Sequence, residues 1–144
     1  KAVVGSAETV NGSITVGAGA EVQKGVEAVN GSLTLRQGAK VAGGFENVNG
    51  SMLVDGAQVD GGIETVNGDI RLATGSHVTG GIHVEEHKTS WWKGKDSRNP
   101  RITIEQGVTV EGPLHFEREV DLYVAPGVNL PPVEGVQPQR FTLQ

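Results

Sequence analysis

The sequence has no cysteine and few aromatic residues. Of its 144 residues, 22 are glycine and only 4% are Phe, Trp or Tyr. The absence of cysteine excludes a disulfide framework and a thiolate metal site. The scarcity of aromatic side chains argues against an ordinary core packed between helices. The length suits one domain with a continuous core and is short for two.

Long apolar runs and a basic stripe are also missing. No run reaches about eighteen apolar residues, so we expect no membrane span. The formal net charge is -5 with interspersed signs, so nucleic acid is not an expected partner. Because the pattern is already under way at Ala7, the start at Lys1 suggests a processed or trimmed terminus. A removed export signal would agree with that, which favours an exported protein over a cytoplasmic one.

The sequence does contain an internal repeat. Val-Asn-Gly begins at Val10, Val29, Val48 and Val66, at spacings of 19, 19 and 18 residues. Each copy has three short stretches of alternating apolar residues, such as Ile14-Thr15-Val16, separated by glycine-bearing links. Alternation is typical of half-buried strands, and glycine allows the sharp corners between them. Each copy therefore predicts three strands and three corners.

A single copy cannot bury its apolar face, so the copies must stack. Equivalent strands would then lie about 4.8 Å apart and pair in parallel. The sequence predicts an all-β fold, a single-stranded right-handed parallel β-helix or three-sided β-solenoid. We expect about six coils of 18–19 residues in one domain over residues 1–144.

The repeat is not uniform along the chain. Pro131 and Pro132 lack amide hydrogens, so we expect them to end the sheets. The predicted segments are an N-terminal lead-in (1–6), regular coils (7–84), an inserted Trp-containing loop (85–99), final coils (100–128) and a Pro-rich C-terminal capping tail (129–144).

Coils such as VNGSLTLRQGAKVAGGFEN resemble those of bactofilins, bacterial polymer-forming cytoskeletal proteins, over residues 7–128. The resemblance implies a right-handed triangular β-helix, end-to-end polymerisation without nucleotide and a scaffolding role near the membrane. A capped carboxyl end would restrict self-association to the N-terminal coil, which would give a closed two-fold homo-oligomer.

The repeat places like side chains over one another. Asn11, Asn30, Asn49 and Asn67 are expected to form a structural ladder in which stacked amides satisfy one another. The valines beside them break the alternation. Either a bulge at this corner or inward-facing asparagines would reconcile the pattern.

A second predicted column contains the candidate metal ligands. It runs Glu8, Glu27, Glu46, Glu64, His83, His115 on the outer face. Glu64, His83 and His115 offer oxygen and imidazole ligands for a divalent ion. The favoured alternative is a solvated row of charges screened by salt. A further column, Glu21, Lys40, Gln58, His77, Thr109, is expected to stabilise the stack through adjacent opposite charges.

The inserted loop supplies the candidate partner-binding residues Trp91, Trp92 and Lys93. Two indoles in a basic loop suit a contact with protein, sugar or a membrane interface. The alternative is that the rings fold down and shield a corner of the coil.

Enzymatic activity is not expected. Ser13, Ser32 and Ser51 recur in the same corner of successive copies, and none has a histidine and an acid in a distinct local arrangement. We expect no cofactor. The first hypothesis is a structural scaffold or interaction module of the bacterial cell envelope or cytoskeleton. Its expected partners are proteins, including further copies of the same chain. The alternative is a carbohydrate-binding or carbohydrate-active β-helix that holds a polysaccharide along its glutamate side.

Overall fold

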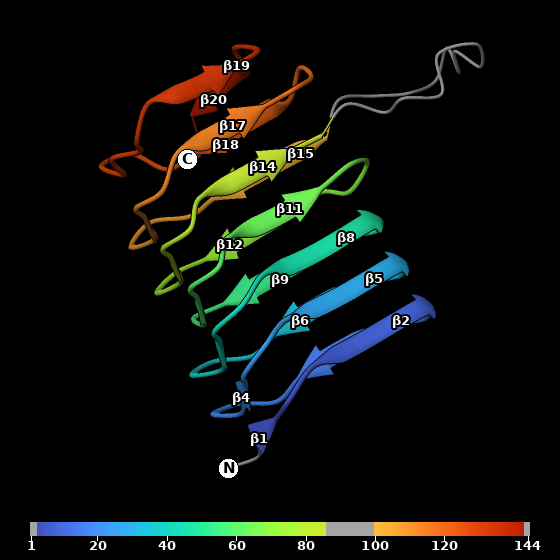
Figure 1. Ribbon diagram of the computed structural model, residues 1–144. Coiled ribbons are helices and arrows are strands. Elements are labelled where there is room, and N and C mark those ends of the chain that lie inside the picture. Colours follow the sequence, from blue (N-terminus) through green and yellow to red (C-terminus); the bar gives the residue numbers. More distant parts are fainter. Residues whose placement is uncertain (1–2, 86–99, 143–144) are drawn as a thin grey trace, which may run out of the picture.

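The computed structural model describes residues 3–85 and 100–142, and these form a parallel β-solenoid of about seven coils (Figure 1). Every strand pairing in it is parallel, and the described residues contain no helix. The predicted all-β, three-sided fold is confirmed. Successive strands pass from one wall to the next, so each wall is one sheet.

The three sheets, named A, B and C, consist of strands that recur every third element in most coils. Sheet A contains β1 (Val3–Val4), β4 (Glu21–Val22), β7 (Lys40–Val41), β10 (Gln58–Val59), β13 (His77–Val78) and β16 (Thr109–Val110). Sheet B contains β2 (Ala7–Asn11), β5 (Val26–Asn30), β8 (Phe45–Asn49), β11 (Ile63–Thr65), β14 (Ile82–Val84), β17 (Leu114–Phe116) and β19 (Val133–Gly135). Sheet C contains β3 (Ile14–Val16), β6 (Leu33–Leu35), β9 (Met52–Asp55), β12 (Ile70–Ala73), β15 (Arg101–Ile104), β18 (Asp121–Val124) and β20 (Gln139–Thr142).

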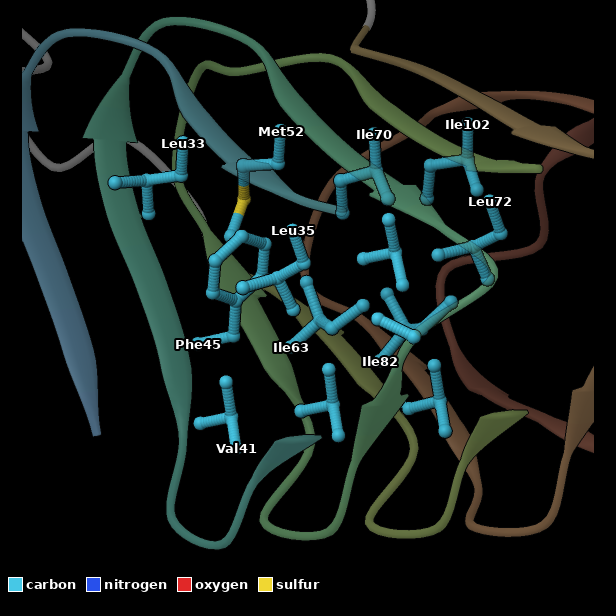
Figure 2. Close-up of a cluster of buried hydrophobic side chains, with 14 of the residues drawn as sticks. Leu33, Leu35, Val41, Phe45, Met52, Ile63, Ile70, Leu72, Ile82 and Ile102 are labelled. Carbon is cyan, nitrogen blue, oxygen red and sulfur yellow. The ribbon is translucent and has the colours of Figure 1, made fainter. Parts of the chain in front are cut away.

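The inward side chains of the three walls fill the axis of the solenoid. In sheet C, Leu33, Met52, Ile70 and Ile102 stack in register and are at most 1% exposed. Figure 2 shows this row facing a second row from sheet B that includes Phe45, Ile63 and Ile82. Burial of these apolar side chains is the main stabilising contribution, because each removes a large apolar area from water.

Two corners show why glycine recurs. A Cβ on Gly43, between sheets A and B, would lie 1.3 Å from the carbonyl oxygen of Lys24 in the preceding coil. Gly50, between sheets B and C, has φ +125, and a Cβ there would lie 2.1 Å from the oxygen of Gly31. Successive backbones approach too closely at these corners for any side chain, so the repeat retains glycine there.

The prediction that Pro131 and Pro132 end the sheets is wrong. Strand β19 follows directly and pairs with β17, and β20 pairs with β18. Residues 129–142 therefore add strands to sheets B and C, and the solenoid has about seven coils where we expected about six. The prolines are tolerated because they precede an edge strand, where an amide donor is not required, and the Pro132 carbonyl still accepts a bond from Leu114 N at 3.5 Å.

Of the two alternatives for the corner beside the asparagines, the one with inward-facing asparagines is wrong. Asn11, Asn30 and Asn49 are exposed, and so are Val10 and Val29, at 63% and 40%. The buried amide at this corner belongs instead to Asn47, which is 4% exposed. Asn47 donates to Gly31 O at 2.9 Å and accepts from the Thr65 hydroxyl at 3.2 Å, so its burial is compensated.

The described residues include no helix that is both long and apolar enough to cross a membrane.

Candidate functional site on the outer face of sheet B

The outer face of sheet B carries the predicted column of acidic residues and histidines, in register. Glu8 pairs with Glu27, Glu27 with Glu46, and Glu46 with Glu64. His83 follows on Glu64, His115 on His83, and Glu134 extends the column by one further coil. We call this set the glutamate–histidine column.

A second outer column lies beside the first, because side chains two residues apart in a strand point to the same face. Its members are Val10, Val29, Val48, Val66, Glu85, Glu117 and Val136. A groove of about 450 Å³ follows the two columns over the earlier coils and is lined by their glutamates and valines. Five coils thus repeat Glu-x-Val, whereas the two coils with histidine carry His83-Val84-Glu85 and His115-Phe116-Glu117.

The stacked carboxylates raise one another's proton affinity. The pKa of Glu64 is raised to about 7, first by a side-chain hydrogen bond with Glu85, then by partial burial and by the charges of Glu85 and Glu46. Partial burial, with the charges of Glu27 and Glu85, also raises the pKa of Glu46. Like charges one coil apart disfavour ionisation, so this face attracts protons or other cations.

His83 has glutamate or histidine neighbours on several sides. Its Nε2 is 2.9 Å from Glu117 Oε2, and its Nδ1 is 3.7 Å from Glu64 Oε2. The His83 and His115 rings meet edge to face with centroids 4.9 Å apart. On the far side, Nδ1 of His115 is 3.6 Å from Glu134 Oε1. All of these side chains are partly exposed to solvent.

The three predicted metal ligands do not form one group. Among the described residues, two sets offer three ligand atoms within 4.8 Å of one another: His83 with His115 and Glu117, and Glu64 with His83 and Glu85. Glu64 and His115 lie on opposite sides of His83. Sequence reasoning missed Glu85 and Glu117, although the His-x-Glu spacing in two coils was the available signal.

The four predicted ladder asparagines are joined by hydrogen bonds at the corner between sheets B and C. The Nδ2 of Asn30, Asn49 and Asn67 each donates to the Oδ1 one coil earlier, at 3.2, 3.0 and 3.0 Å. The Arg118 guanidinium donates to the last acceptor, Asn67 Oδ1, at 2.9 Å. The ladder joins four successive coils next to the glutamate–histidine column.

The other walls carry isolated charge pairs. On sheet A, Glu21, Lys40, Gln58, His77 and Thr109 stack as expected, and His77 contacts Glu111. On sheet C, Arg71 pairs with Glu105 at 2.6 Å, and Arg101 lies over the Tyr123 ring. A groove of about 840 Å³ crosses this wall between Leu53 and Gln106. The predicted partner-binding residues Trp91, Trp92 and Lys93 lie outside the described residues.

Comparisons with family models, with curated proteins and with solved structures give no match to this chain. The architecture is therefore established by the structure itself.

Proposed function

We propose that this protein is a non-enzymatic structural scaffold that self-associates through its N-terminal coil. The observation that carries this proposal is the column of inward valines in sheet A, which is buried inside the solenoid and exposed at the first described coil. Val22 and Val41 are 2% and 0% exposed, whereas Val4, which stacks on Val22, is 40% exposed.

The strand edges of this coil are also open. Within the described residues, β1, β2 and β3 end sheets A, B and C on this side, and β16, β19 and β20 end them on the other. Terminal strands present unpaired backbone groups that another chain can pair with. A second copy placed on the first coil would extend all three walls and cover the open apolar layer. A two-fold arrangement of this kind closes as a dimer.

The resemblance to bactofilins agrees with a scaffold of the bacterial cell envelope or cytoskeleton. The repeated Glu-x-Val surface of sheet B also suits display to an extended partner, since equivalent groups recur once per coil. Repetition favours architecture over catalysis, because an active site needs a single constellation of residues.

Light scattering across a protein concentration series tests self-association. We expect the mass of the wild type to rise with concentration, and Val4→Lys to abolish the rise by placing a charge in the interface. Val29→Lys is the matched control, because Val29 is also 40% exposed but lies on the outer face of an interior coil. A wild type that stays monomeric, or equal effects of the two variants, would contradict the proposal.

A second candidate is carbohydrate binding, favoured by the groove on sheet C. Its lining combines Arg71, Arg101, Asp69 and Glu105 with the Thr103 hydroxyl, a mixture of donors and acceptors that suits a sugar chain. Saturable binding of a polysaccharide on a glycan array by a monomer, lost in Arg101→Ala, would favour this function over the scaffold.

A further inference from the structure

Two adjacent coils of sheet B depart together from the repeat. In the described coils, Glu-x-Val occupies the outer positions at Glu8, Glu27, Glu46, Glu64 and Glu134. The coils between Glu64 and Glu134 carry His-x-Glu instead. Because His83 and His115 pair in register, the substitutions form a block of two histidines and two glutamates on one face. Neither packing nor strand pairing requires this change, since all four side chains point outward.

The block brings metal-ligating atoms together. His83, His115 and Glu117 each offer one ligand atom, and the three atoms lie within 4.8 Å of one another. The His83 Nε2 and Glu117 Oε2 are already 2.9 Å apart. Tetrahedral ligands at bond lengths of 2.0–2.1 Å are separated by about 3.3 Å, so small rotations of partly exposed side chains would close the site.

The neighbouring carboxylates are placed to orient both rings. Glu64 lies beside Nδ1 of His83 at 3.7 Å, and Glu134 lies beside Nδ1 of His115 at 3.6 Å. A carboxylate beside the non-ligating nitrogen of an imidazole is the usual outer support of a histidine-bound metal, because it fixes the tautomer and the ring orientation. Because the carboxylates lie beside Nδ1, the Nε2 atom of each ring remains available to bind the ion.

We propose that His83, His115 and Glu117 bind a divalent transition-metal ion of the Zn²⁺ class. Glu64 and Glu134 act as positioning residues, and Glu85 adds negative charge beside the site. Two imidazoles and a carboxylate suit Zn²⁺ and its first-row neighbours, whereas Mg²⁺ and Ca²⁺ prefer oxygen ligands alone. The bound ion joins β14 to β17 across the point where the repeat is interrupted.

Titration calorimetry with ZnCl₂ on chelator-treated protein tests the site. We expect one saturable site per chain in the wild type and no comparable site with MgCl₂. Glu134→Gln, which removes an outer support, should weaken Zn²⁺ binding by about tenfold, and His115→Ala and Glu117→Gln, which remove ligands, should each weaken it more. Circular dichroism checks that each variant keeps its β structure.

His77→Ala is the matched control. His77 is also a partly exposed histidine in contact with a glutamate, Glu111, but it lies on sheet A, away from the block. This variant should bind Zn²⁺ as the wild type does. The proposal is overturned if the folded wild type binds no Zn²⁺ saturably, if MgCl₂ binds equally well, or if His77→Ala loses as much affinity as His115→Ala.

Discussion

Residue choice is constrained differently inside the solenoid and on the outer face of sheet B. Inside sheet A, the inward position is valine in every coil from Val22 to Val110, because each must fill the same space against its neighbours. Outside sheet B, the stacked position changes from Glu64 to His83 without any change in strand pairing. Packing therefore dictates the interior, and the exterior is free to carry chemistry.

This contrast identifies informative departures from the repeat. A change inside the coil must be accommodated by close-packed neighbours, and it reports on stability. A coordinated change outside, such as the paired His-x-Glu segments, has no packing reason and points to binding. Substitutions at the corners, on the asparagine ladder and on the acidic surface test this contrast.

The largest effect is expected at a corner glycine. In Gly50→Ala the new Cβ would lie 2.1 Å from Gly31 O at a residue with φ +125, so both overpacking and backbone strain act. We expect a loss of about 3 kcal/mol or more in the free energy of unfolding, measured by urea denaturation.

The matched control for this corner is Gly17→Ala. No atom lies within 4 Å of a Cβ at Gly17, and its φ is not positive. We expect its stability to stay within about 0.5 kcal/mol of the wild type. Equal losses in the two variants would show that close backbone approach does not govern the corners.

An intermediate effect is expected on the asparagine ladder, whose side chains are exposed but joined by hydrogen bonds. Asn49→Ala removes two ladder hydrogen bonds, both of 3.0 Å, and should cost about 1 kcal/mol in urea denaturation. Asn11→Ala removes one bond of 3.2 Å at the end of the ladder and should cost less. A larger loss for Asn11→Ala than for Asn49→Ala would show that these hydrogen bonds do not determine the stability of the corner.

The smallest effect concerns the exposed acidic surface. Because the pKa of Glu64 is raised to about 7 from 4.5, the folded protein holds a proton in this interval that the unfolded chain releases. The free energy of unfolding should therefore fall slightly as the pH rises through that window. Solvent screening keeps this contribution small.

Denaturation at pH 5 and pH 8, with a chelator present, measures the effect. Glu64→Gln should show a smaller fall in stability between the two values than the wild type. A steeper fall in the variant would mean that Glu64 does not hold this proton.

The glycine-cornered repeat by itself determined the three-sided parallel architecture and the side-chain columns. Spacings of 18 and 19 residues leave one arrangement in which Ile14, Leu33, Met52 and Ile70 share a core, and that register carries the outward residues with it. Strand alternation also places Glu64, His83 and His115 on the same face of three successive strands, with His83 in the middle.

Only the tertiary structure decided which of these neighbours form a site and where the solenoid continues. Glu117 joins the histidines because side-chain directions and the corner after β17 bring it 2.9 Å from His83, a relation between residues 34 apart. Strands β19 and β20 form despite Pro131 and Pro132, because an existing sheet edge supplies pairing partners that local sequence does not reveal. The local sequence pattern specifies the face to which each side chain points and the length of each coil. The distances between side chains of different coils depend on the folded solenoid.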